Sequence, residues 1–217
     1  AIRSRGLGDV YKRQIKQHQT PNWFKKAKFG IYAHWGIYSV PAAGPNVTWY
    51  PYWMYRPPSP QFDYHCKHYG HPSKFGYKDF IPMFTAEKFN AEEWADLYYR
   101  SGAKFAGPVA EHHDGFPMWN CSDTEWCASK MGPKRDIVGE LEKAIRNKGM
   151  KYMVAMHHAE NWFFFPHWNN DFDTSKKEYE SLYGELHNLD LIGNQAVYPD
   201  HWGRKNEHQD KPSKAFH

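Results

Sequence analysis

Histidines that follow three separate apolar runs carry the clearest chemical potential in this sequence. His34 lies within the run at 29–36, His112 and His113 follow the run at 104–110, and His157 opens a pair after the run at 151–156. A neutral imidazole offers one hydrogen-bond donor and one acceptor. That suits a ligand hydroxyl group, which also donates and accepts. The alternative for His34 is a core histidine bonded to a backbone carbonyl, and for His157 a packed aromatic rim.

Two amphipathic segments separate the apolar runs and predict the elements that position the histidines. In the first, at 91–101, Asn90 is the expected N-cap, Glu93 completes a capping box, and Gly102 stands where a left-handed residue ends a helix. The second predicted helix spans 136–148. Helical spacing predicts one buried face on each helix, formed in the first by Trp94, Leu97, Tyr98 and Ser101, and in the second by Ile137, Val138, Leu141, Ala144 and Ile145.

Apolar runs that alternate with helices predict parallel βαβ units, here with strands at 29–36, 104–110 and 151–156. In a parallel α/β fold the C-terminal ends of the strands lie at one face, where active sites form. We therefore predict an α/β fold in which the histidines meet at one mouth. The Pro-, Tyr- and Trp-rich stretch at 40–60 is expected to be a loop over one end, and the chain after Trp162 to be irregular.

Composition argues against several classes of protein. The 217-residue chain has a net charge of +4, and its basic and acidic residues are interleaved, so no basic stripe predicts nucleic-acid binding. Cys66, Cys121 and Cys127 lack CxxC spacing and are odd in number, which disfavours a disulfide framework or a zinc site built on them. The sequence contains no apolar run of about 18 residues, so no membrane span is predicted.

Residues 1–14 lack an initiator Met and a hydrophobic pattern, so we expect a non-native leader before a domain at 15–217.

Four segments, which cover most of residues 22–165, resemble glycoside hydrolase family 29, the α-L-fucosidases. They are WFKKAKFGIYAHWGIYSVPA at 23–42, FTAEKFNAEEWADLYYRSGAKF at 84–105, EHHDGFPMW at 111–119 and MGPKRDIVGELEKAIRNKGMKY at 131–152. The order HWG, HHDGF and GPKRD is much more specific than any one motif. The resemblance implies a (β/α)8 TIM-like barrel, of which this chain would hold the first three or so β/α units.

The resemblance also implies roles for individual residues. In the family, the His of HWG and both His of HHDGF line the fucose pocket and bond the sugar hydroxyls, which assigns substrate binding to His34, His112 and His113. The nearest matches for the aromatic side chain that faces the sugar methyl group are Trp49 and Trp119, and His157 is expected at the pocket wall. Thr48 stands where many members have Glu, which affects the expected substrate preference rather than the class.

The activity that the resemblance implies is retaining hydrolysis of terminal α-L-fucosyl linkages in oligosaccharides or glycoconjugates. One carboxylate attacks the anomeric carbon and a second carboxyl group serves as acid and base, without metal or cofactor. Both carboxyl groups are expected beyond His217, so we expect an inactive fragment of the catalytic barrel. The family suggests a periplasmic or secreted location. A fucose-binding lectin-like protein and a metal-dependent hydrolase remain as alternatives.

The residues around the HHDGF and GPKRD motifs have other interpretations. A metal site at His112, His113 and Asp114 is disfavoured, because adjacent strand residues point to opposite faces and no HxH or HExxH spacing occurs. Glu111 and Asp114 could be catalytic carboxylates, but bonding to backbone amides or to a nearby Lys or Arg is the expected role. In GPKRD, Asp136 is expected to cap a helix beside an Arg135 ion pair rather than bind phosphate.

Overall fold

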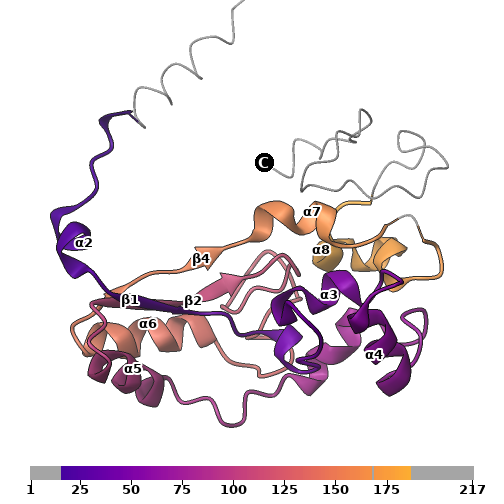
Figure 1. The fold of residues 1–217 in the computed structure, drawn as a ribbon, viewed down its shortest axis with the longest axis horizontal. Helices are drawn as coiled ribbons and strands as arrows, with labels where there is room; N and C mark the ends of the chain where they lie inside the picture. Colours follow the sequence, from indigo (N-terminus) through magenta and orange to yellow (C-terminus); the bar gives the residue numbers. More distant parts are fainter. Residues whose placement is uncertain (1–15, 168, 187–217) are drawn as a thin grey trace, which may run out of the picture.

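The computed structural model describes residues 16–167 and 169–186, and its centre is a parallel sheet (Figure 1). The strands are β1 (Gly30–Ala33), β2 (Phe105–Glu111), β3 (Lys151–Tyr152) and β4 (Ala155–Met156). β2 lies in the middle, with β1 on one side and β3 and β4 on the other, and every pairing is parallel. The predicted α/β fold with parallel strands is confirmed. The expectations for residues 1–14 and for the chain beyond 186 lie outside the described residues.

The third apolar run forms two short strands instead of the single strand predicted at 151–156. Between them, the Met153 amide still donates to the Ala106 carbonyl at 3.1 Å, but the register against β2 then shifts between Val109 and Glu111. Gly107 permits this path, because a Cβ atom at Gly107 would lie 1.6 Å from the Met153 carbonyl oxygen. The division of the strand therefore depends on a close approach between two backbones, which a hydrophobic run does not reveal.

Helices α5 (Ala91–Arg100) and α6 (Ile137–Asn147) pack against each other on one face of the sheet (Figure 1). α6 follows its prediction: Asp136 accepts a hydrogen bond from the Gly139 amide at 2.8 Å. Arg135 forms an ion pair with Glu140, which agrees with the ion pair predicted beside the cap. The buried residues of α6 are Ile137, Leu141, Ala144 and Ile145, while Val138 is half-buried.

α5 has the predicted ends but a different buried face. Asn90 caps it by accepting from the Glu92 and Glu93 amides at 3.0 and 3.3 Å, and Gly102 has a φ of +91°. The predictions for Leu97 and Ser101 are wrong, since the Leu97 side chain is 58% exposed and Ser101 is exposed as well. The helix instead buries Ala91, Ala95 and Tyr98. The small side chains of alanine allow close packing between helices. A search for a stripe of large apolar residues does not find this face.

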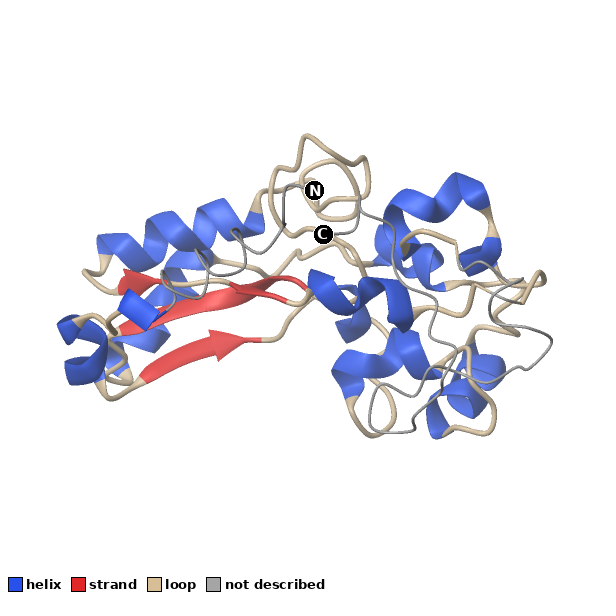
Figure 2. Cartoon of the chain, turned by 90° about the horizontal axis from the view of Figure 1, so that it is seen from above, coloured by secondary structure: helices blue, strands red, loops and turns tan. Residues whose placement is uncertain are grey.

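Short helical elements gather beyond the C-terminal ends of the strands (Figure 2). The prediction of a loop at 40–60 is wrong, because this stretch contains helical turns and leads into a helix. Pro51 and Pro60 lie in first helical turns, where the missing amide of proline costs no hydrogen bond. The ones before β2 are η1 (Ile37–Ser39), η2 (Val47–Trp49), α3 (Tyr50–Trp53), α4 (Pro60–His68) and η3 (Tyr77–Met83); those after β4 are η4 (His158–Glu160), α7 (Asn161–Phe164), η5 (Asp173–Ser175), η6 (Lys177–Tyr179) and α8 (Glu180–Tyr183). Helix α2 (Asn22–Ala27) lies instead at the opposite end of the sheet, just before β1 (Figure 1).

An aromatic core holds these short elements together. The Tyr55 hydroxyl donates to Asp173 at 2.8 Å and accepts from the Tyr77 amide at 2.7 Å, so it ties the chain just after α3 to η3 and η5. Fully buried aromatic side chains fill the surrounding space: Tyr38, Tyr50, Tyr77, Phe80, Phe116, Phe164, Phe165 and Tyr183. None of the described helices is long and apolar enough to cross a membrane.

Candidate functional site

The strand ends bring four histidines together, and we call His34, His112, His113 and His157 the histidine cluster. His34 follows β1 directly, His112 follows β2, and His157 follows β4. The ring centroids of His112 and His113 are 4.5 Å apart, and those two rings lie 4.8 and 4.9 Å from His157. The His34 ring is 5.4 Å from both His112 and His157. The parallel sheet thus explains how residues far apart in sequence share one site.

His112 and His113 face the same site, although they are neighbours in sequence. The expectation that their side chains point to opposite faces is wrong, because β2 ends at Glu111 and both histidines lie beyond the strand. The turn that follows contains Gly115 with a φ of +73°, where the Asn161 side chain and the Leu182 carbonyl leave no room for a Cβ atom. Because the strand has ended, the side chains of His112 and His113 no longer alternate between the two faces of the sheet.

A backbone hydrogen bond orients His113. Its Nδ1 lies 2.8 Å from the His157 carbonyl oxygen, which can only accept, so Nδ1 carries the proton. The other ring nitrogen of His113, Nε2, lies 3.5 Å from Oε2 of Glu160. A second backbone contact holds the same turn, since the Asn161 amide group donates to the His113 carbonyl at 2.9 Å. The β2 and β4 ends are therefore joined through the cluster itself.

The imidazole of His112 is buried and uncharged. Burial lowers its pKa to about 2, and repulsion from His113, His157 and His34 acts in the same direction. Burial also lowers the pKa of His157. At neutral pH these two rings are therefore neutral imidazoles, which can accept as well as donate a hydrogen bond.

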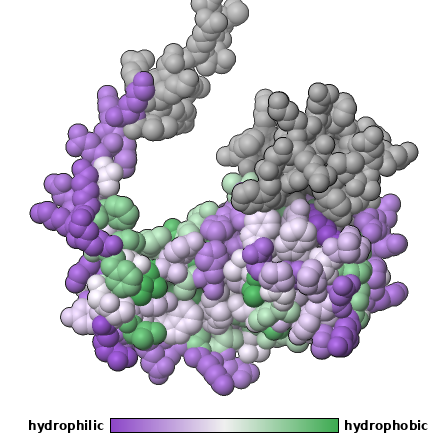
Figure 3. Space-filling view, viewed as in Figure 1, coloured by the Kyte–Doolittle hydropathy of each residue, from purple (hydrophilic) through white to green (hydrophobic). Residues whose placement is uncertain are grey.

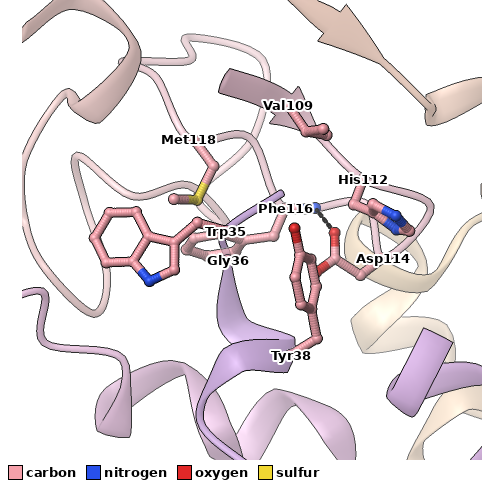
Figure 4. A pocket seen from close by; sticks show the side chains of 8 residues that line it. All are labelled: Trp35, Gly36, Tyr38, Val109, His112, Asp114, Phe116 and Met118. Atoms are coloured by element: carbon pink, nitrogen blue, oxygen red, sulfur yellow. Dashed lines mark hydrogen bonds between the residues drawn. The ribbon is translucent and has the colours of Figure 1, made fainter. Parts of the chain in front are cut away.

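A small cavity adjoins His112 (Figure 4). Its volume is about 10 Å³, enough for roughly one water molecule. Two buried atoms on its lining, Nδ1 of His112 and the hydroxyl oxygen of Tyr38, have no hydrogen-bond partner among the described residues. The complete lining is Trp35, Gly36, Tyr38, Val109, His112, Asp114, Phe116 and Met118. The cavity is thus polar on the side where Tyr38, His112 and Asp114 meet.

The two carboxylates beside the cluster are bound to neighbouring protein groups. Asp114 accepts from the Tyr77 hydroxyl at 2.7 Å and from the Phe116 amide at 3.3 Å, and burial raises the pKa of its carboxyl group to about 7. Glu111 is buried and pairs with Nδ1 of His158. The backbone bond of Asp114 agrees with the structural role predicted for it. The partner of Glu111 is a histidine rather than the expected Lys or Arg.

Trp49 borders the cluster from η2. Its ring centroid lies 5.2 Å from that of His113 and 5.3 Å from that of Phe164. Thr48 precedes it and is half-buried. Trp119 is also half-buried, directly after the cavity residue Met118, but the ring contacts described for the cluster do not include it. Of the two tryptophans, Trp49 is the one with a described contact to a histidine.

Three aromatic neighbours of the cluster were missed by the sequence analysis. The Tyr32 hydroxyl bonds Nε2 of His34 at 2.9 Å, the Tyr38 ring lies 5.1 Å from His112, and the Phe164 ring lies 5.2 Å from His113. Strand alternation could have found Tyr32, which precedes His34 by two positions. No periodic signal points to Phe164, because it reaches the cluster from a later segment.

Comparison with known proteins now identifies the family. The family model described as alpha-L-fucosidase matches residues 9–216. The chain belongs to the α-L-fucosidase family. The plasma α-L-fucosidase of Homo sapiens is 46% identical over 150 residues, which cover 69% of this chain and 32% of that protein. The α-L-fucosidase of Dictyostelium discoideum is 36% identical over 189 residues, which cover 84% of this chain and 40% of that protein.

A solved structure of an α-L-fucosidase relative shares the fold. The α-fucosidase of Thermotoga maritima, solved in complex with a mechanism-based inhibitor, superposes with a TM-score of 0.63 at 43% identity. The match covers 66% of this chain and 36% of that chain. The present chain therefore spans roughly a third of the length of these α-L-fucosidases.

Proposed function

We propose that this chain forms the N-terminal part of the catalytic domain of a retaining α-L-fucosidase. Residues 15–217 would supply the first three or so units of a (β/α)8 barrel. The order β1, β2, β3 in the sheet supports this, because consecutive strands of such a barrel are neighbours. Membership of the family and the fold shared with the Thermotoga maritima enzyme support it as well.

The proposed role of the histidine cluster is to bind the hydroxyl groups of a terminal α-L-fucose residue of a glycan. The observation that carries this proposal is the convergence of His34, His112, His113 and His157 at the C-terminal ends of parallel strands. Each pair of rings in contact has a centroid distance of 5.4 Å or less. Neutral imidazoles suit hydroxyl groups, which donate and accept.

An aromatic wall completes the proposed pocket. Trp49 lies against His113, so its ring is available to pack on the apolar edge and methyl group of the sugar. We propose the same role for Trp119 only as a second candidate, because its described contacts lie on the backbone. Thr48 next to Trp49 offers a hydroxyl in place of a charge, and we propose that it tunes the choice of substrate.

The bond-breaking carboxyl groups are proposed to lie in the remainder of the longer protein. Retaining hydrolysis requires two carboxyl groups about 5–5.5 Å apart, one free to attack and one free to transfer a proton. Asp114 is completely enclosed and bonded to Tyr77, and Glu111 pairs with His158. Both are thus used within the fold. We propose that this chain binds fucose but does not hydrolyse fucosides.

The test measures binding and hydrolysis separately. L-Fucose is titrated into the chain while tryptophan fluorescence is followed, and an aryl α-L-fucoside is supplied to the chain and to a longer version that extends beyond His217. We expect saturable binding by the chain, about tenfold weaker after His113→Gln because one hydrogen bond is lost. His68→Gln, on the exposed side of α4, is the matched control and should not change binding.

The outcomes separate the three candidate functions. Hydrolysis by the longer protein alone supports the proposal. Turnover by the rigorously purified chain would contradict the proposed location of the nucleophile. Fucose binding without hydrolysis by the longer protein would instead favour a lectin-like function, and hydrolysis that a chelator abolishes would favour a metal-dependent hydrolase.

A further inference from the structure

Three imidazoles of the histidine cluster have their candidate ligand atoms close to one another. The candidate ligand atoms of His112, His113 and His157 all lie within 4.8 Å of one another. Imidazole nitrogen is a preferred ligand of Zn²⁺ and Cu²⁺. His34 is close by, but its Nε2 is already bonded to the Tyr32 hydroxyl at 2.9 Å. By distance, His112, His113 and His157 form the candidate ligand set.

The surroundings of these histidines resemble the outer shell of a metal site. A ligating histidine usually donates its second ring N–H to a backbone carbonyl, a carboxylate or a water molecule, which fixes the ring. His113 does this through Nδ1 to the His157 carbonyl at 2.8 Å. His112 borders the cavity of about 10 Å³ beside Asp114 and Tyr38, and one water molecule there would give its free nitrogen a partner.

We propose that His112, His113 and His157 bind a divalent transition-metal ion, Zn²⁺ or Cu²⁺, and that this ion and the sugar exclude each other. The second half rests on the proposed fucose-binding function of the same cluster. Three protein ligands leave one position of a tetrahedral ion open to water. Glu160 is a further candidate ligand, since its Oε2 is 3.5 Å from Nε2 of His113.

Binding requires a small contraction of the cluster. With Zn–N bonds of about 2.0–2.1 Å, ligand nitrogens of a tetrahedral ion lie about 3.3 Å apart. The 4.8 Å limit in the structure means that the rings must approach by up to about 1.5 Å. His157 is half-buried, whereas His112 and His113 are buried, so we expect its ring to make the adjustment.

The metal is tested directly by titrating ZnCl₂ into the full chain in a calorimeter, without any substrate. The chain has 14 histidines, so the relevant signal is the one equivalent that depends on the cluster. Loss of an outer-shell partner already weakens metal binding about 10–100-fold. His113→Gln and His157→Gln should therefore each weaken this equivalent at least about tenfold. His68→Gln is the control and should leave it unchanged.

The result that would overturn the metal site is equal zinc binding by the parent chain and both cluster variants, or no binding at all. Circular dichroism checks that each variant is folded, and the half-buried His157 provides a variant with less risk to the core. The zinc titration does not depend on fucose binding, so the metal site would survive a failure of the proposed function.

Mutual exclusion is tested by repeating the zinc titration in saturating L-fucose. We expect the apparent zinc affinity of the chain to fall, and Zn²⁺ to inhibit the longer enzyme competitively. Unchanged zinc affinity, in a chain shown to bind fucose, would overturn the exclusion while leaving the metal site in place. Activation of hydrolysis by Zn²⁺ would overturn it too.

Discussion

Asp114 is a buried carboxyl group beside the histidine cluster. It is 2% exposed, and its carboxylate accepts hydrogen bonds from the Tyr77 hydroxyl and the Phe116 amide. Both bonds favour the ionised form, yet burial outweighs them and raises the pKa from 3.8 to about 7. Asp114 lies two positions from His112 and lines the same cavity, so its charge acts on the electrostatics of the site.

The first prediction concerns the pH dependence of stability. A carboxyl group with a raised pKa binds its proton more tightly in the folded state, so its contribution to stability is lost as the pH rises from about 4 to about 7. The loss amounts to as much as about 4 kcal/mol in the free energy of unfolding. Asp114→Asn cannot ionise and should lack this loss. Urea unfolding of both proteins at several pH values measures the difference, and parallel curves would contradict the raised pKa.

Two buried tyrosines at the cavity provide a second, paired prediction. The Tyr77 hydroxyl donates to Asp114 at 2.7 Å, whereas the Tyr38 hydroxyl has no partner among the described residues. At pH 8, Tyr77→Phe should lower the free energy of unfolding by about 1.5–3 kcal/mol, since it removes a hydrogen bond to a charged group. Tyr38→Phe should change it by less than about 1 kcal/mol. Equal losses would show that the Tyr38 hydroxyl has an equivalent partner, such as a water molecule in the cavity.

At the scale of elements, the site depends on where strands end and how closely they approach. β2 ends at Glu111, which releases His112 and His113 from strand alternation. The break between β3 and β4 comes at Met153 and Val154, just before the chain delivers His157. The His157 amide then donates to the Glu111 carbonyl at 2.9 Å, which fixes the two strand ends side by side. The cluster is therefore a consequence of the ends of the sheet.

The third prediction tests the close approach at Gly107. A Cβ atom there would lie 1.6 Å from the Met153 carbonyl oxygen, which belongs to backbone and cannot rotate away. Gly107→Ala should therefore separate β2 from the β3–β4 segment and cost at least about 3 kcal/mol. Gly102→Ala is the control: it meets no atom within 4 Å and should cost only about 1–2 kcal/mol through its positive φ. Similar losses in thermal unfolding for both variants would contradict this account.

At the scale of the whole molecule, the described part of the sheet is open. β1 and the β3–β4 pair form its two edges, and neither has a second partner strand among the described residues. Large apolar side chains are exposed there: Phe29 at 47%, Tyr32 at 48%, Val154 at 43% and Met156 at 52%. Figure 3 shows apolar surface at the end of the molecule where α2 and β1 lie. In the proposed barrel, later strands would cover such edges.

The fourth prediction follows from these edges. Exposed, unpaired strands promote association, so the chain alone should form larger species as its concentration rises. The double substitution of Val154→Lys and Met156→Lys should shift the chain toward monomer, because charge on an edge strand opposes pairing. Leu97→Lys, at an exposed site on α5 away from the strand edges, should not. Size-exclusion chromatography with light scattering gives the masses, and a parent chain that stays monomeric at all concentrations would contradict the prediction.

Local sequence signals predicted the elements well where the chain follows a regular period. The caps and apolar stripe of α6 were visible because they depend on residues within a few positions of one another. The same logic assigned Leu97 of α5 to the wrong face, because the small residue Ala95 marks the packed side. It also missed the helical turns around Pro51, since proline breaks a helix interior but is tolerated in its first turn.

The alternation of strands and helices, the placement of histidines after the strands and hence their arrival at one face all follow from the sequence alone. They do so because hydrophobic period, caps and chain order are local properties. Three features depend on the three-dimensional fold: which nitrogen of His113 carries its proton, which tryptophan contacts the cluster, and how three imidazoles come close to one another. These features depend on contacts such as that between His113 and the His157 carbonyl, 44 residues apart, which no local pattern encodes.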